Sequence, residues 1–489
     1  MNDFYTNFTI NLCKNSNKTA TKQSLLTTIW KKVVKNAQKY WKKVVILHRN
    51  KWKKVANMLN RKTIRNLESW YESTHKKAAL VTGARQVGKT TAIREFAHRH
   101  YQHFVEVNFV KRPVARQAFD GDLDTSTIIA NLSAMGFGPF IEGQTLVFFD
   151  EIQECPNART AIKFLVEEHR YDFIESGSLL GINYKEVPSY PVGFEQEYTM
   201  FPLDFEEFLW AKGIGDETIQ LMRQAYESRQ PLSEFIHNQF FKYFREYLVV
   251  GGMPEAVQTY IDNDDFRLTA EVQRSILTTY RADISKYAGK AQTLVKRIFD
   301  AIPSELGKQD KRFVLADIEQ GASRRKYEDP TQWLIDAGIA YYSFNTSAFE
   351  LPFEATENRK LYKLYMVDTG LLSRMLLKGL QFNVMHGDID INEGALTENF
   401  VACALSAKGI PLHYYDRKSK QELDFIIEEN NAISILEVKS GDAFTRHASL
   451  DAAMKSFPEK IGRAIVFCKS NVFEKDGVLY LPLYMAMLL

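Results

Sequence analysis

One short stretch restricts the fold more than any other: GARQVGKTT, from Gly83 to Thr91, directly after the apolar run AALVT. The pattern G-x-x-x-x-G-K-[ST] is that of the phosphate-binding loop, which joins a buried strand to a helix. Glycine lets the backbone turn its N–H groups toward phosphates, and the helix N-terminus adds partial positive charge. The stretch therefore predicts a nucleotide site between a strand and a helix that begins near Thr90.

The residues of this loop have separate expected roles. Lys89 should reach the terminal phosphates, and the Thr90 hydroxyl should bind Mg²⁺. No guanine-reading N-K-x-D motif occurs, so ATP is preferred over GTP as the cofactor, together with Mg²⁺. The predicted cofactor-binding residues are Gly83, Ala84, Arg85, Gln86, Val87, Gly88, Lys89, Thr90 and Thr91.

A second apolar run, in LVFFDEIQE, ends in two carboxylates, Asp150 and Glu151. At the end of a parallel strand both groups lie at the carboxyl edge of the sheet, where open α/β folds bind ligands. We expect Asp150 to hold the Mg²⁺ shell and Glu151 to polarise the attacking water. A solvated turn is the alternative, and the preceding phosphate loop disfavours it.

Ser178, in the stretch IESGSLLG, is the third predicted catalytic residue beside Glu151 and Lys89. It would lie next to Asp150 if the two strands are neighbours, in position to orient the water or the terminal phosphate. The alternative is a serine that caps the following helix.

Apolar runs that alternate with helical segments predict an α/β fold with a parallel sheet covered on both faces. These runs are residues 78–82, 103–110, 145–150 and 171–176. Helical periodicity follows, then two short helices and a strand in the outline of a winged helix, and finally a mixed α/β unit. The predicted domains are 1–57, a basic amphipathic extension; 58–201, the nucleotide-binding core; 202–300, a helical lid and connector; 301–356, winged-helix-like; and 357–489, the C-terminal unit.

The winged-helix candidate carries Arg324, Arg325 and Lys326 at the start of its second helix, where recognition helices face DNA. A rigid connector with a solvated basic turn is the alternative.

Charge is distributed unevenly along the chain. Residues 14–54 carry thirteen Lys and Arg and no Asp or Glu, although the net charge of the whole chain is only +3. Apolar residues at three- and four-residue spacing predict a basic amphipathic helix or two over 24–57, able to lie on nucleic acid or on an anionic membrane surface. The alternatives are an appendage of no fixed role, or an upstream extension with Met58 as the working start.

No run approaches the roughly 18 apolar residues that a membrane span needs. The start also lacks the apolar core and cleavage site of a secretory signal. The four cysteines are scattered without a C-x-x-C pair, so neither a zinc site nor a disulfide framework is expected. These features predict a soluble protein of the reducing cytoplasm.

Two stretches near the carboxyl terminus, GALTENFVACAL and QELDFIIEENNAISILEVKSG, resemble a metal-dependent nuclease pattern. That pattern has a Glu on a helix, an Asp on a strand, and Glu-x-Lys on the next strand. Strand side chains alternate between faces, so the Glu and Lys of Glu-x-Lys share one face. The residues at these positions are Glu398, Asp424, Glu437 and Lys439.

A two-residue turn at Asn430 and Asn431 would pair Asp424 directly with Glu437. Two carboxylates so close together repel each other, and a divalent cation such as Mg²⁺ would relieve this repulsion. Glu398 could complete the coordination shell of the cation. Lys439 could steady the scissile phosphate or the attacking water. The alternatives are a degenerate nucleic-acid-binding domain and a structural hairpin in which a surface salt bridge joins Lys439 to Glu422.

Five stretches together carry a family resemblance: GARQVGKT, VFFDEIQECPNA, SGSLLG, FPLDFEEFLWA and YLVVGGMPEAV. In this order they resemble bacterial and archaeal AAA-type ATP-binding proteins whose carboxyl-terminal half is a family of unknown function with a restriction-nuclease-like fold. The resemblance covers about residues 58–480. It implies an AAA-type ATPase core, a helical lid, a winged-helix linker and a terminal domain. The family often has a basic residue where this chain reads Gly193-Phe194-Glu195, so no arginine finger is assigned.

Two classes of function follow. In the first, an ATPase acts on DNA or RNA, which the terminal domain grips or cuts. In the second, a nucleotide-switched signalling or assembly protein has a catalytically inactive terminal domain that binds another protein. No oligomeric state is predicted.

Overall fold

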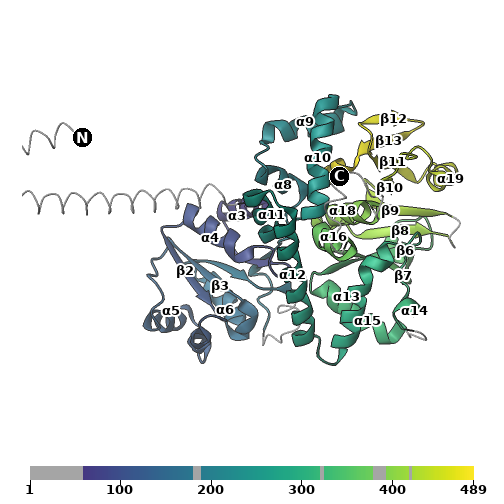
Figure 1. Ribbon diagram of the computed structural model, residues 1–489. Coiled ribbons are helices and arrows are strands. Elements are labelled where there is room, and N and C mark those ends of the chain that lie inside the picture. Colours follow the sequence, from purple (N-terminus) through teal and green to yellow (C-terminus); the bar gives the residue numbers. More distant parts are fainter. Residues whose placement is uncertain (1–58, 180–188, 320–323, 378–392, 418–420) are drawn as a thin grey trace, which may run out of the picture. The chain divides into compact units, whose positions relative to one another are not determined.

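The computed structural model describes residues 59–179, 189–319, 324–377, 393–417 and 421–489 (Figure 1). The predicted basic extension, residues 1–57, lies outside the described residues. Residues 59–489 form one compact unit. Along the described chain, no helix combines the length and the apolar character required to cross a membrane.

The first sheet has five parallel strands. They are β1 (Ala78–Thr82), β2 (His103–Asn108), β3 (Thr145–Asp150), β4 (Asp172–Ser176) and β5 (Glu195–Thr199). Their order in the sheet is β2-β3-β4-β1-β5. Strands β1 to β4 match the four predicted apolar runs, and the parallel sheet confirms the α/β prediction. The fifth strand was missed because its residues, EQEYT, are polar and lie at the sheet edge, where burial is not required.

Helices cover both faces of this sheet (Figure 1). They are α3 (Lys62–Tyr71), α4 (Lys89–His100), α5 (Thr125–Ala134) and α6 (Pro156–Glu167). One apolar core joins Ile162 and Leu165 of α6 to Leu80 of β1. Another joins Phe96 of α4 to Val81 on the opposite side of the same strand. A strand buried on both faces explains the unbroken apolar run AALVT.

The middle of the chain is helical, as predicted. Its helices are α8 (Phe205–Ala211), α9 (Asp216–Ser228), α10 (Glu234–Val250), α11 (Pro254–Asn263), α12 (Phe266–Tyr287) and α13 (Gln292–Leu306). A capping box of Asp204 and Glu207 begins α8. The turn before α11 needs its glycine, since a Cβ on Gly252 would lie 2.0 Å from the Leu203 carbonyl oxygen.

The second sheet is mixed and has eight strands in the order β12-β13-β11-β10-β9-β8-β6-β7. The strands are β6 (Ala340–Thr346), β7 (Glu357–Met366), β8 (Leu412–Asp416), β9 (Glu422–Glu429), β10 (Ala432–Val438), β11 (Ile461–Cys468), β12 (Phe473–Lys475) and β13 (Val478–Pro482). The helices of this region are α14 (Leu315–Ile318), α15 (Arg324–Asp336), α16 (Thr369–Leu377), α18 (Glu393–Ala407) and α19 (Ala448–Ser456).

The segment with the winged-helix outline does contain two helices, α14 and α15, followed by a strand, β6. That strand pairs antiparallel with β7 and parallel with β8. Through β6 the segment is therefore continuous with the C-terminal sheet.

One apolar core joins the middle helices to the C-terminal sheet. Phe205 of α8 and Phe244 of α10 both contact Phe400 of α18, the latter with ring centroids 4.9 Å apart. The middle helices and the second sheet are therefore packed against each other through a shared core.

Candidate functional site

The backbone of residues 83–88 has the turn that a phosphate loop requires. Gly83 has φ +141°, and a Cβ there would lie 2.2 Å from the Met200 carbonyl oxygen. Gln86 and Gly88 also have positive φ, of 66° and 95°. Only glycine fits the first position, and α4 begins directly after Gly88.

Lys89 lies over this loop. Its Nζ donates hydrogen bonds of 2.9 Å to the carbonyl oxygens of Gly83 and Ala84. Burial lowers the pKa of Lys89 to about 8, although the charges of Glu151 and Asp150 act to raise it. The ammonium is thus held at the point where phosphates would enter the loop.

Asp150 is the centre of a polar cluster at the carboxyl edge of the sheet. It is 3% exposed. Its carboxylate accepts hydrogen bonds from Thr90 Oγ1 at 3.1 Å, Asn108 Nδ2 at 2.6 Å and Ser176 Oγ at 2.6 Å. Strand register explains the cluster, since Asn108 and Ser176 both pair with Asp150 across β2, β3 and β4. A carboxylate and a hydroxyl placed this way fit a Mg²⁺ ion.

The neighbouring strands that the prediction for Ser178 assumed are present, and Ser176, at the end of β4, is bonded to Asp150. Ser178 lies two residues beyond the end of β4. Glu151, the predicted base, has a left-handed backbone with φ 58° and accepts a hydrogen bond from Gln153. Asn108 and Ser176 were not predicted, although each is the last residue of a strand.

Arg61 is a further residue that was not predicted. Its side chain is 6% exposed and pairs with Glu207 at 3.2 Å. It also donates to the carbonyl oxygens of Val87, at 2.8 Å, and Phe201, at 2.6 Å. It therefore fixes the end of the phosphate loop to the start of the helical region. No local pattern around Arg61 could have indicated this.

The opposite end of the loop contacts α12. Arg85 forms an ion pair with Asp283, and Tyr280 donates to the Arg85 carbonyl oxygen at 3.2 Å. Burial raises the pKa of Asp283, while the charge of Arg85 acts to lower it. Tyr280 and Asp283 are three residues apart and share one face of the helix. The loop is thus held to α12 by a side chain and by its backbone.

In the C-terminal sheet, the β9–β10 hairpin has the predicted register. Asn430 and Asn431 have φ of 52° and 60°, as the two-residue turn requires. Pairing runs from Ala432 opposite Glu429 to Leu436 opposite Phe425.

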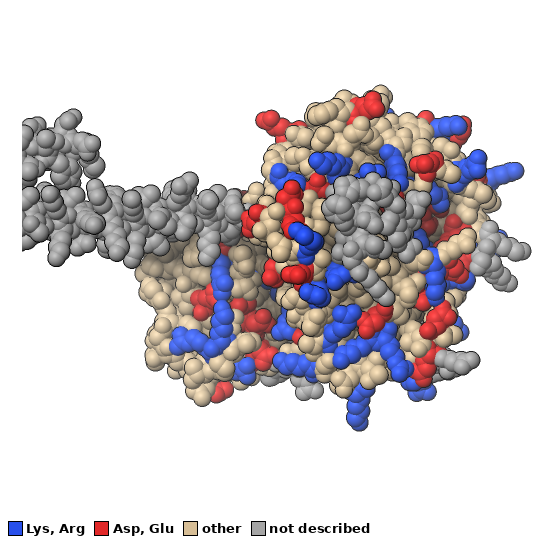
Figure 2. Space-filling model, in the orientation of Figure 1, with Lys and Arg blue, Asp and Glu red and all other residues tan. Residues whose placement is uncertain are grey.

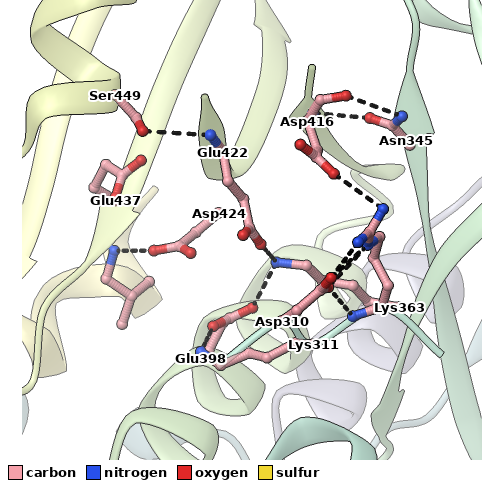
Figure 3. A network of polar contacts seen from close by, with 12 residues as sticks. Asp310, Lys311, Asn345, Lys363, Glu398, Asp416, Glu422, Asp424, Glu437 and Ser449 are labelled. Atoms are coloured by element: carbon pink, nitrogen blue, oxygen red, sulfur yellow. Dashed lines mark hydrogen bonds and ion pairs between the residues drawn. The ribbon is translucent and has the colours of Figure 1, made fainter. Parts of the chain in front are cut away.

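The predicted residues of this hairpin lie together just beyond those pairs (Figure 3). Asp424 accepts a hydrogen bond of 2.8 Å from the Val438 backbone N–H. Lys439 pairs with Glu437 at 2.9 Å, and Glu422, its partner in the salt-bridge alternative, pairs with Lys363 at 2.9 Å.

Glu398 of α18 is bound by cations of the chain itself. It is 1% exposed and accepts from Lys311, from Lys363 at 3.3 Å and from the Tyr365 hydroxyl. Burial alone would raise the pKa of Glu398, but the ammonium groups of Lys311 and Lys363 lower it to about 2. Glu398 is therefore a carboxylate with both oxygens engaged.

Burial and the nearby Asp424 charge raise the pKa of Glu437 to about 8. Burial and the charge of Glu398 also raise the pKa of Asp424. Among the described residues, no three Asp, Glu, His or Cys side chains are arranged to hold a metal ion. The predicted residues are brought close together, yet lysines lie where the prediction placed a cation.

Residues 75–209 match the model of an AAA domain. The chain contains an AAA domain. Beyond this AAA domain, residues 241–381 match a domain of unknown function, DUF8612, and residues 393–485 match another, DUF4143. The parallel sheet is typical of P-loop ATPase domains. The matched descriptions name neither a winged helix nor a nuclease, so both stay predictions.

Three solved structures are similar to the chain that carries this AAA domain. A Walker-type ATPase of Pyrococcus abyssi has 15% identity and a TM-score of 0.40, over 65% of this chain and 96% of its own. The Orc1 protein of Aeropyrum pernix, in complex with DNA, has 11% identity and a TM-score of 0.28, over 67% of this chain and 94% of its own. A RuvB variant of Thermotoga maritima has 13% identity and a TM-score of 0.27, over 58% of this chain and 89% of its own. No curated protein sequence matches the chain.

Proposed function

We propose that the protein binds ATP with Mg²⁺ and hydrolyses it. The observation that carries the proposal is the cluster at Asp150, whose carboxylate is bonded to Thr90 and lies at the same sheet edge as Lys89. Two elements distant in sequence converge there: α4 supplies Lys89 and Thr90, and β3 supplies Asp150, which are groups that nucleotide chemistry requires.

The residues of this site have distinct roles in the proposed reaction. Lys89 donates to the terminal phosphates, and Thr90 and Asp150 hold Mg²⁺, which neutralises phosphate charge when bound. Asn108 and Ser176 fix the orientation of Asp150. Glu151 accepts the proton of the attacking water or orients that water, and Gln153 positions its carboxylate.

Two substitutions test this proposal. Lys89→Ala should abolish both the binding of a fluorescent ATP analogue and phosphate release, whereas Glu151→Gln should retain binding and lose most turnover. Lys111→Ala, which changes an exposed lysine of the same domain, is the matched control. Wild-type nucleotide affinity in Lys89→Ala would refute the site, and full turnover in Glu151→Gln would show that another group activates the water.

The C-terminal half has two candidate roles in this proposal. Arg85 and Asp283 connect the phosphate loop to α12, and the shared apolar core connects the helices to the second sheet. The nucleotide state can thereby change how this sheet binds DNA or RNA, or how it binds another protein. Exposed Arg325 of α15 supports the first role. The interleaving of basic and acidic residues on the face shown in Figure 2 supports the second, because it lacks a broad basic patch.

Binding of labelled DNA and RNA at low and high salt, with and without ATP, separates these roles. Phosphate contacts weaken steeply as salt rises. Nucleic-acid binding that is salt-dependent and changes with ATP would support the first role, and its absence at low salt would leave the protein-binding role. Cytoplasmic localisation belongs to the same proposal, and the free thiols Cys155, Cys403 and Cys468 support it.

A further inference from the structure

Three carboxyl groups lie close together in the C-terminal sheet: Glu398 on α18, Asp424 on β9 and Glu437 on β10 (Figure 3). Glu398 is 1% exposed and Glu437 is 2% exposed. Buried groups of like charge need a compensating positive charge, which in proteins comes from a metal ion or from basic side chains.

Here the positive charge comes from lysines on three different segments. Lys363 is on β7 and is fully buried, with its ammonium bonded to Glu398 and Glu422. Lys439 follows β10 and pairs with Glu437. Lys311 belongs to residues 307–314, which connect α13 to α14, and pairs with the Glu398 oxygen that Lys363 does not hold.

Lysine ammonium groups hold the carboxyl oxygens of this cluster. Lys363 pairs with Oε1 of Glu398 and Lys311 pairs with Oε2, while Lys439 pairs with Glu437. As arranged, the cluster does not fit a divalent ion, which would add two positive charges and meet an ammonium at each oxygen of Glu398.

We propose that Lys311 is a tethered cation that takes the place of a metal ion at Glu398, so that a divalent ion can bind only after Lys311 is removed. Lys311 is the removable member because it lies outside the strands and its side chain is 19% exposed, whereas Lys363 is held within the sheet. A binding capacity remains in the cluster: Glu437 Oε1 is buried and has no hydrogen-bond partner.

The test measures Mn²⁺ binding to the full-length protein without nucleotide. The electron paramagnetic resonance signal of the free ion reports how much Mn²⁺ remains unbound. Lys311→Met should gain one Mn²⁺ site at the carboxyl cluster. Its affinity for Mn²⁺ should be at least tenfold higher than that of the same cluster in the wild type. Lys308→Met is the matched control, because Lys308 lies in the same segment but pairs with Glu305 and Asp317. Binding at Asp150 would be equal in all variants. Adding Glu398→Gln to Lys311→Met should abolish the gained site.

A thermal measurement covers the case in which Lys311→Met folds poorly. Mn²⁺ should then raise the melting temperature of this variant by more than that of Lys308→Met, because binding at Asp150 stabilises both equally. The proposal is overturned if wild-type protein already binds Mn²⁺ at a Glu398-dependent site as tightly as Lys311→Met does. It is also overturned if Lys311→Met gains neither Mn²⁺ affinity nor Mn²⁺-dependent thermal stability.

Discussion

At the scale of single residues, the candidate ATP site combines groups that a local motif identifies with groups that only the folded sheet brings in. Lys89, Thr90 and Asp150 were predicted, because each follows or begins an element whose pattern is readable in the sequence. Asn108 and Ser176 were not, because their contact with Asp150 depends on strand order, which β2-β3-β4 pairing determines. Sequence spacing carries no information on that order.

Ser176 and Ser178 make different predictions for turnover. Ser176→Ala removes a hydrogen bond of 2.6 Å to the buried Asp150 carboxylate, so its kcat for ATP should fall roughly 10- to 100-fold, equivalent to about 1.5–3 kcal/mol. Ser178→Ala should have the smaller effect. Steady-state phosphate release measures both. A larger loss in Ser178→Ala would establish Ser178 as the serine that acts on the reaction.

Arg61 should matter more for stability than its position near the start of the described chain suggests. Arg61→Ala leaves Glu207, whose side chain is 5% exposed, without its cation, and it frees the Val87 and Phe201 carbonyl oxygens. Breaking a buried pair of this kind costs about 3–5 kcal/mol.

Chemical denaturation of Arg61→Ala measures this cost. The control is Arg65→Ala, whose ion pair with Asp216 is 62% exposed on the arginine side and should contribute less than about 1 kcal/mol. Equal losses of unfolding free energy in the two variants would show that the buried ion pair contributes no more stability than the exposed one.

At the scale of elements, the regular apolar strands and the Asn-Asn hairpin were predictable, since burial and turn chemistry are local properties. The polar edge strand β5 was not, because pairing at an edge needs no apolar residues. The role of β6 was also hidden. It pairs with β8, which lies about 70 residues later in the chain, and no local pattern encodes such a partner.

Asp368 lies between β7 and α16 and connects this part of the chain to Gly252 in the middle helical region. Its burial should make the stability of the protein depend on pH. Its carboxylate is 2% exposed and accepts backbone hydrogen bonds from Gly252 and Leu371. Burial raises its pKa from 3.8 to about 6, although these hydrogen bonds act to lower it. Among the described residues, the titratable groups that interact with its charge are Tyr247, Tyr280, Tyr341 and Cys403.

The sign follows from which state binds the proton more tightly. Between about pH 4 and pH 6 the folded protein retains the Asp368 proton and the unfolded chain does not, so the free energy of unfolding falls as pH rises. The loss should approach about 3 kcal/mol. Asp368→Asn cannot ionise, so urea denaturation at pH 4, 5, 6 and 7 should give it a flatter profile than wild type. The exposed Asp122→Asn should follow wild type, and parallel profiles for wild type and Asp368→Asn would contradict the assignment.

At the scale of the whole molecule, the division of the chain is testable by truncation. Residues 59–489 form one compact unit, in which Arg61 ties the phosphate loop to the helical region. Deletion of residues 1–57 retains Arg61 and all described elements. We therefore expect the shortened protein to keep the melting temperature and ATPase rate of the full chain.

A second truncation, of residues 1–61, serves as the comparison because it removes Arg61. It should lower the melting temperature and weaken ATP binding, since the Val87 and Phe201 carbonyl oxygens and Glu207 lose their donor. If deletion of 1–57 alone gives insoluble or ATP-inactive protein, the extension is part of the folded enzyme and the appendage interpretation fails. If that deletion removes only binding to DNA or to anionic lipid vesicles, the thirteen basic residues of 14–54 act as an attachment segment whose loss leaves the ATP site intact.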